Sequence, residues 1–217
     1  MAQLWLDFRQ ITMNYNLPFN WFDVAVLLMV MIGYTRGRKR GMSVESISMV
    51  MWIVIAIVSA IAYEPLGLMI DSYAKLGKLT SFLIAYTIIA LGIALAFSYV
   101  KQTLGKKLTG SDAFGKSEYY LGIPAGMVRF ACVVMVFLAL LNARYYSIAE
   151  IKAQTKYDLD NYGSSFFPHL YSVQDDVFRK SFVGSNVKKH LDFLLIKSTN
   201  GHGVSAPVVK RKEFSLP

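Results

Sequence analysis

Long runs of uncharged residues dominate the first two thirds of the chain. Ser46–Tyr63 holds 18 residues without a charge, Leu79–Val100 holds 22, and Tyr119–Ala143 holds 25 that only Arg129 interrupts. A helix on the surface of a soluble protein keeps one face polar, whereas the ~30 Å hydrocarbon core of a bilayer requires about 20 predominantly apolar residues. These three segments therefore predict membrane-spanning helices.

A fourth, shorter apolar stretch precedes them. Val24–Thr35 contains 12 uncharged residues, and Trp21 extends this stretch toward the N-terminus. Asn20 is suited to cap a helix there, because Asp23 three positions later completes a capping box and meets the positive end of the helix dipole. A helix from Asn20 to Lys39 is about 28 Å long, which is enough to cross the membrane.

Together these segments predict an all-α membrane protein, with a four-transmembrane-helix bundle and a C-terminal extramembrane helical tail. The second span is expected to end before Pro65. The expected spans cover approximately residues 20–39, 43–63, 79–101 and 120–142. The expected regions are an N-terminal extramembrane segment at 1–19, a membrane domain at 20–146, and an extracytoplasmic helical tail with a mobile end at 147–217.

The tail carries a helical pattern of its own. Apolar side chains recur at helical spacing through Leu170–Ile196, and Gly184-Ser185-Asn186 predicts a break into two helices. Two arrangements remain open: the helices lie on the outer face of the membrane, or they pack on the spans or on a partner. The Gly-, Ser- and Lys-rich segment Ser198–Pro217 is expected to be mobile.

The distribution of charge predicts an orientation. The formal net charge is +9, with 17% charged residues, against ~25% in soluble domains. Lys and Arg in short loops mark the cytoplasmic side, so the two basic loops are expected there and both termini outside. Anionic lipid headgroups, not nucleic acid, are the expected partner of these residues. The basic loops hold Arg36, Arg38, Lys39, Arg40, Lys101, Lys106, Lys107 and Lys116.

Arg129 is the one charged residue inside Tyr119–Ala143, the last apolar segment along the chain. Ionisable residues within spans are functional candidates by default, and the side chain of Arg129 points back toward the cytoplasmic start of its helix. Glu45 at the start of the second span is its expected partner, and Asp112 in the preceding loop is the second candidate. A tie between two spans and a place along a solute path both remain open.

Small residues recur at four-residue spacing in three of the spans. Such faces allow helices to approach closely, because lipid provides no hydrophobic force between spans. We expect them to pack within one molecule, with contacts between copies in a homo-oligomer as the alternative. The residues are Gly33, Gly37 and Gly41, then Gly92 and Ala96, then Gly122 and Gly126.

The chain shows no recognisable pattern of catalytic or metal-binding residues. GxSxG, HExxH, GxGxxG and P-loop sequences are absent. The single cysteine, Cys132, cannot form an intrachain disulfide, and the three histidines all fall in the tail. The sequence therefore predicts no enzyme activity, no catalytic residue, no cofactor and no metal ion.

Polar and small residues follow a recognisable order through the membrane domain. They are Asp23, Arg40, Gly41, Glu45, Trp52, Asp112, Gly122, Gly126 and Arg129. Over Trp21–Tyr146 this order resembles the colicin V production protein family of bacterial inner-membrane proteins, whose pattern has the form D…RGxxxE…W…D…LGxxxGxxRG. Phe130 stands where that pattern has its last glycine, so we expect bulk where the family permits close approach.

The resemblance implies a multi-pass plasma-membrane protein of bacterial origin, linked to toxin (bacteriocin) production or export. We interpret the chain as a non-enzymatic membrane accessory or scaffold protein that also supports envelope function. Its tail is expected to recruit an unknown membrane or extracytoplasmic protein partner. The alternative is a small oligomeric channel or transporter, which requires polar residues along a water-filled path, and the second and third spans offer few of them.

Overall fold

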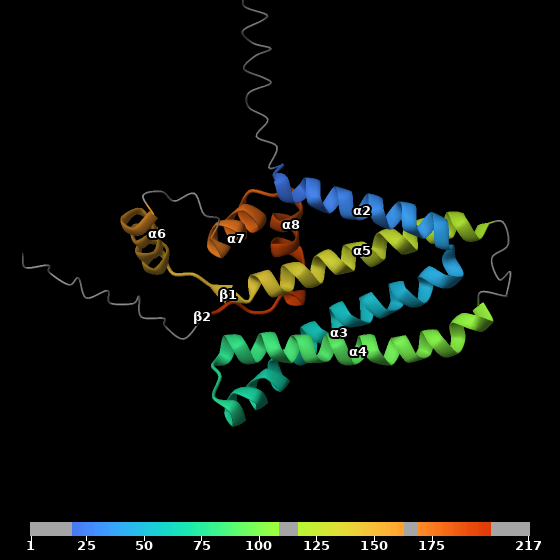
Figure 1. The fold of residues 1–217 in the computed structure, drawn as a ribbon, viewed down its shortest axis with the longest axis horizontal. Coiled ribbons are helices and arrows are strands. Elements are labelled where there is room, and N and C mark those ends of the chain that lie inside the picture. Colours follow the sequence, from blue (N-terminus) through green and yellow to red (C-terminus); the bar gives the residue numbers. More distant parts are fainter. Residues whose placement is uncertain (1–18, 109–116, 163–168, 201–217) are drawn as a thin grey trace, which may run out of the picture.

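The computed structural model describes residues 19–108, 117–162 and 169–200. Its four long helices lie side by side (Figure 1). They are α2 (Trp21–Arg40), α3 (Met42–Ala74), α4 (Lys78–Leu108) and α5 (Glu118–Asn142). The remaining elements are β1 (Arg144–Tyr145), α6 (Ile148–Tyr162), α7 (Leu170–Arg179), α8 (Phe182–His190), the 3₁₀ helix η2 (Asp192–Leu194) and β2 (Thr199–Asn200).

The long helices form an open row in the order α2, α5, α3, α4. Extensive contacts join α2 to α5, α5 to α3, and α3 to α4. The two edge helices, α2 and α4, make no extensive contact with each other. The predicted bundle is therefore a layer of helices, and each edge helix leaves most of its surface uncovered.

Three of the helices are long and apolar enough to cross a membrane. They are Met42–Ala74, the Lys78–Thr103 part of α4, and Glu118–Asn142. This confirms three of the four predicted spans. The helix at the fourth predicted span, α2, is not among these three. It carries charges at both ends, with Asp23 in its first turn and basic residues in its last turn.

The second span is longer than predicted. We expected it to end before Pro65, but α3 continues to Ala74. A proline removes one backbone hydrogen bond and crowds the preceding turn. Here the helix stays packed beyond Pro65 because Gly67 lies against the Phe82 ring of α4, where a Cβ would collide with that ring.

Asp71 shapes the turn between α3 and α4. Its Oδ1 accepts hydrogen bonds from the Gly77 amide at 2.9 Å and from the Ser81 hydroxyl at 3.5 Å. Lys75 ends α3 in the left-handed conformation, with φ of 51°. A polar network, not the proline, thus sets the end of this span.

The break between the last two helices also lies elsewhere than predicted. It falls at Lys180 and Ser181, and Gly184–Asn186 lies inside α8. The Oγ of Ser181 caps α8 by accepting a hydrogen bond from the Gly184 amide at 2.9 Å. Gly184 is needed for close packing, because a Cβ there would overlap the backbone carbonyl of Val177 in α7.

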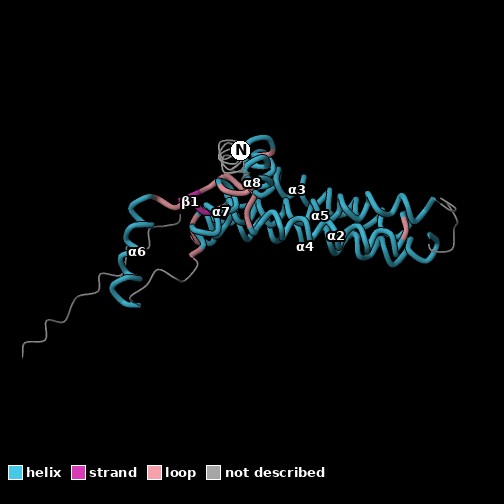
Figure 2. Tube along the Cα trace, turned by 90° about the horizontal axis from the view of Figure 1, so that it is seen from above, coloured by secondary structure: helices cyan, strands magenta, loops and turns pink. Residues whose placement is uncertain are grey.

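The segment that we expected to be mobile begins with a short ordered pairing. Thr199 and Asn200 form β2, which pairs in parallel with Arg144 and Tyr145. The rest of that expectation, residues 201–217, lies outside the described residues, as does the N-terminal segment up to residue 18. Figure 2 shows α6 set apart at one end of the long axis, beyond β1 and α7.

Candidate functional site

Two joints between elements contain most of the residues singled out from the sequence. The first lies at the basic end, where α2 ends and α3 and α5 begin. The second lies at the opposite, cap end, where residues 169–200 (the cap) cover the ends of the long helices. Asp112 is assigned to neither joint, because it lies outside the described residues.

At the basic end, α2 and α5 meet backbone to backbone. Gly33 and Gly37 of α2 and Gly122 and Gly126 of α5 are all buried. A Cβ on Gly33 would lie 2.7 Å from the carbonyl oxygen of Gly126, and a Cβ on Gly37 would overlap that of Gly122. These four glycines therefore pack within one molecule. The contact between copies of the chain that we also considered stays a prediction.

Gly41 completes this joint through its backbone conformation. It connects α2 to α3 with φ of 76°, a region that L side chains rarely adopt, and its amide donates to the Gly37 carbonyl at 3.0 Å. A Cβ there would also collide with the Glu118 side chain, and a Cβ on Gly122 would approach the Gly41 backbone. Gly41 thus permits both the turn and the approach of α5.

Phe130 supplies the expected bulk at this joint, but it does not keep the helices apart. Its ring lies beside Gly33, where a Cβ would come 3.1 Å from Phe130 Cδ2. The missing side chain of Gly33 leaves the space that the ring occupies. The Phe130 ring also lies under the guanidinium of Arg129, with 5.4 Å between Cζ and the ring centroid.

Glu45 carries the buried charge of this joint, and its side chain is 0% exposed. Arg129 Nη1 donates a hydrogen bond to Glu45 Oε1 at 2.6 Å, so the predicted ion pair is present. Arg40 Nη1 lies 3.8 Å from Glu45 Oε2. The pair ties α3 to α5, and Arg40 extends it to the end of α2. Trp52 lies farther along α3 and is half-buried.

Asp23 builds the second joint, at the cap end. Its side chain is buried, and its carboxylate accepts hydrogen bonds from the amides of Phe182 at 3.0 Å and Val183 at 2.9 Å, in the first turn of α8. It also accepts from the Asn20 amide at 2.9 Å, which completes the predicted capping box. One carboxylate therefore meets the positive ends of two helices, α2 and α8.

Six further polar contacts fasten the cap to α5, β1 and α3. Gln174 donates to the carbonyls of Leu141 at 3.0 Å and Arg144 at 2.9 Å, which closes the C-terminal end of α5. The buried Asn142 donates to the Ile196 carbonyl and accepts from Lys188. The remaining two come from Lys197, whose amide donates to the Tyr63 hydroxyl and whose ammonium pairs with Glu64 at 2.8 Å.

The carboxylate of Glu64 shifts the pKa of its partner, Lys197. The hydrogen bond from Lys197 to that carboxylate raises the pKa of the Lys197 ammonium above its ordinary value.

Apolar packing accompanies these polar contacts, since Val177, Val187, Leu195 and Ile196 of the cap join one core cluster with Phe22 and Leu141 of the long helices. Of the two arrangements open for the tail helices, the structure has α7 and α8 packed on the long helices.

The sequence analysis missed the partners of Asp23. Asn20 and Asp23 were interpreted as local caps of α2, and no pattern pointed to the amides of α8, about 160 positions later in the chain. Gln174 and Asn142 were missed for the same reason. A buried carboxylate at a helix start, beside a tail rich in potential partners, was the only available signal.

The two joints lie at opposite ends of α2, so Asp23 and Glu45 cannot act as an acid–base pair. Within the described residues, no group of three or more His, Cys, Asp or Glu side chains is placed to hold a metal ion. What the arrangement does chemically is to neutralise buried charge and to hold backbones in contact.

Comparison with known proteins identifies the family. The family model described as colicin V production protein matches residues 22–155, well over half of the 217 residues. Neither the search of curated proteins nor the search of solved structures found a match. The matched range contains Asp23, Glu45 and Arg129, three of the charged residues that hold the two joints together. The chain belongs to the colicin V production protein family.

Proposed function

We propose that this protein is a non-enzymatic accessory or scaffold protein of the bacterial inner membrane. It supports toxin (bacteriocin) production or export and envelope function. The chain crosses the membrane four times, with the basic end in the cytoplasm and with both termini and the cap outside. Family membership and three apolar helices of sufficient length support this proposal.

The exposed surface of α2 supports its role as the fourth span. Its face away from α5 is a continuous apolar stripe, and its charged residues are confined to the first turn and the last two turns. Such a stripe is costly in water and favourable against acyl chains. The exposed residues of the stripe are Val24, Leu27, Leu28, Met31 and Ile32.

The observation that carries the scaffold proposal is that the residues of the family pattern contact other helices of the same molecule. Glu45 and Arg129 satisfy each other, and the glycines bring α2 and α5 into backbone contact. Asp23 holds the cap against α2. Each of these contacts fixes one element on another, as a platform requires, whereas a water-filled path requires polar groups that face a lumen.

The cap supplies the surface that such a platform would present. It exposes large apolar side chains at positions next to its anchor points, including Phe182 at 58% and Phe193 at 72%. Phe182 directly follows Ser181, the N-cap of helix α8, and its backbone amide donates a hydrogen bond to Asp23. The position of Phe182 therefore depends directly on that carboxylate.

Bacteriocin release tests this function. We expect the wild-type protein to restore toxin release to a bacteriocin-producing strain that lacks its own family member. The Asp23→Ala variant leaves two amides of α8 without an acceptor, at a cost of about 1–3 kcal/mol, so the cap loosens and release falls. The measurement is toxin activity in the culture medium, at equal membrane content of each variant.

Asp175→Ala is the matched control, because it removes a cap carboxylate whose partners, Arg179 and Lys180, are exposed. We expect this variant to keep wild-type release. Failure of the wild-type protein to restore release would contradict the link to toxin export. Equal release by Asp23→Ala and wild type would contradict the role given to the cap.

A further inference from the structure

The last two turns of α2 form a basic surface that the joints do not use. Arg36, Arg38 and Lys39 are exposed, and no carboxylate of the described residues lies within 4 Å of their charged groups. Arg40 differs from these three, because it turns toward Glu45. Three positive charges therefore remain on one helix end, without a partner in the described part of the chain.

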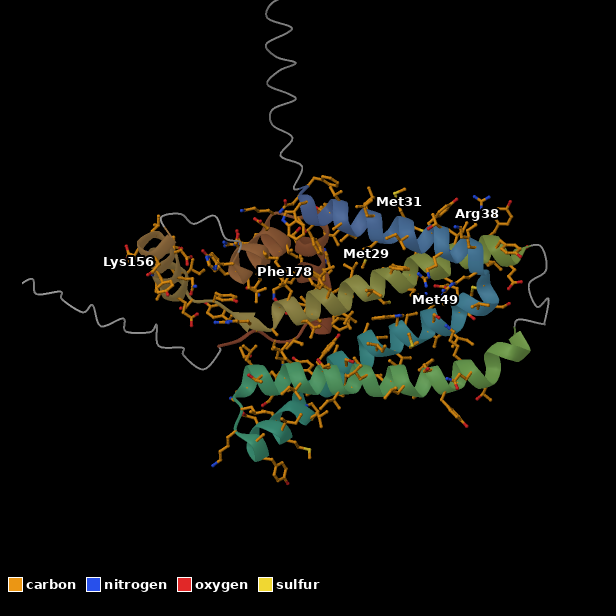
Figure 3. All side chains as sticks on the ribbon, in the orientation of Figure 1. Met29, Met31, Arg38, Met49, Lys156 and Phe178 are labelled. Atoms are coloured by element: carbon orange, nitrogen blue, oxygen red, sulfur yellow. The ribbon has the colours of Figure 1, made fainter. Side chains whose placement is uncertain are left out.

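Two of these charges, Arg38 and Lys39, continue the apolar stripe of α2. Seven residues make two helical turns, so Arg38 lies about 10 Å above Met31 on the same face, and Lys39 lies likewise above Ile32. Met31 and Ile32 are exposed members of the stripe. Figure 3 shows Met31 and Arg38 on the side of α2 that faces away from α5, whereas Met29 lies toward α5. The face thus changes from apolar to basic along its length.

Aromatic residues with polar tips surround the place where this change occurs. Tyr34 on α2 and Tyr119 and Tyr120 at the start of α5 are exposed. Tyrosine concentrates at the level of lipid headgroups, where its ring is apolar and its hydroxyl meets water. The two described carboxylates nearby do not compete for the basic residues, because Glu45 is paired with Arg129 and Glu118 lies over Gly41.

We propose that this face of α2 is a binding site for an anionic phospholipid. The acyl chains lie along Leu28, Met31 and Ile32, and the phosphate lies between Arg38 and Lys39. The proposal rests on the proposed insertion of α2 into the membrane. The lipid class follows from charge: a zwitterionic headgroup adds its own cation beside these basic side chains, whereas an anionic headgroup such as phosphatidylglycerol does not.

Native mass spectrometry of the purified protein tests this site. The protein in neutral detergent is titrated with phosphatidylglycerol or with phosphatidylcholine of the same acyl chains. We expect wild type to retain phosphatidylglycerol preferentially. The Arg38→Gln/Lys39→Gln variant is expected to bind it about 25-fold more weakly, since each basic side chain near an anionic surface contributes about fivefold in affinity.

Two control variants separate the site from total charge and from folding. Lys152→Gln/Lys156→Gln removes the same charge from exposed positions of α6 and is expected to bind as wild type does. Arg38→Lys/Lys39→Arg keeps the charge and is expected to keep the preference. Equal retention of the two lipids by wild type, or undiminished retention by Arg38→Gln/Lys39→Gln, would overturn the proposal.

Labelling of a single cysteine distinguishes failure of this site from failure of the fourth span. In a Cys132→Ser background, Met31→Cys is exposed to a membrane-impermeant maleimide in intact vesicles. If the cysteine is not labelled and the wild-type protein shows no preference for phosphatidylglycerol, the lipid site alone is overturned. A labelled cysteine overturns both the fourth span and the lipid site, whereas toxin release reports on the proposed function independently of both.

Discussion

Replacing Arg129 with alanine leaves the Glu45 carboxylate buried without its hydrogen-bonded counterion, and we expect a loss of about 3–5 kcal/mol in stability. Glu45 is fully buried, so water cannot replace the guanidinium. Arg40 makes no hydrogen bond to this carboxylate, because its Nη1 lies 3.8 Å from Glu45 Oε2, beyond hydrogen-bonding distance. Denaturant unfolding in mixed micelles measures the effect, and less protein should accumulate in membranes.

A double variant separates the isolated charge from the lost contact. Glu45→Gln/Arg129→Gln removes both charges and keeps polar side chains of similar reach. We expect it to be more stable than Arg129→Ala, because an unpaired buried charge costs more than the loss of the whole pair. An Arg129→Ala protein as stable as wild type would contradict the tie between α3 and α5.

Gly37→Ala is expected to destabilise the contact between α2 and α5 by about 1–3 kcal/mol, the usual cost of overpacking. The new methyl group would overlap the carbonyl oxygen of Gly122, which belongs to rigid helical backbone. The helices must therefore separate, and their other contacts weaken together. Unfolding in mixed micelles gives the loss of stability, and labelling of buried positions on α2 reports the separation.

Gly92→Ala is the matched control for this substitution. Gly92 also lies within a long helix, but a Cβ there meets no atom within 4 Å. We expect no loss of stability, since alanine is the better helix former. If the two alanine variants lose the same stability, the close approach at Gly37 carries no special weight.

Hydrophobic length and buried charge are the features that the sequence predicted well. Three uncharged runs correspond to three helices of membrane-spanning length. Arg129 was paired correctly with Glu45 because a charge within a span requires a partner, and Glu45 stands at the start of the second span on the same side. The glycines of α2 and α5 were likewise interpreted correctly as faces for packing within the molecule. The same prediction was wrong for Gly92 and Ala96 of α4, which are exposed, and a Cβ on Gly92 would meet no atom within 4 Å.

The order of the helices and the contacts of the cap were beyond such reasoning. A helix facing lipid is as apolar as one facing another helix, so composition does not distinguish the edge helix α4 from the central α3. Asp23 binds amides that carry no side-chain signature. Pro65 and Gly184 predicted helix breaks that the structure does not have, because the tertiary packing that favours Gly67 and Gly184 inside helices cannot be recognised from the local sequence.

The residues of the family pattern, among them Glu45 and Arg129, join structural elements and do not line a solute path through the membrane. Ion and small-solute flux in proteoliposomes tests this claim most directly, with wild type compared with the Glu45→Gln/Arg129→Gln variant after equal insertion is verified. We predict that wild type conducts no more than protein-free liposomes. Flux through wild type that the folded double variant loses would contradict the claim and would place Glu45 and Arg129 along a solute path.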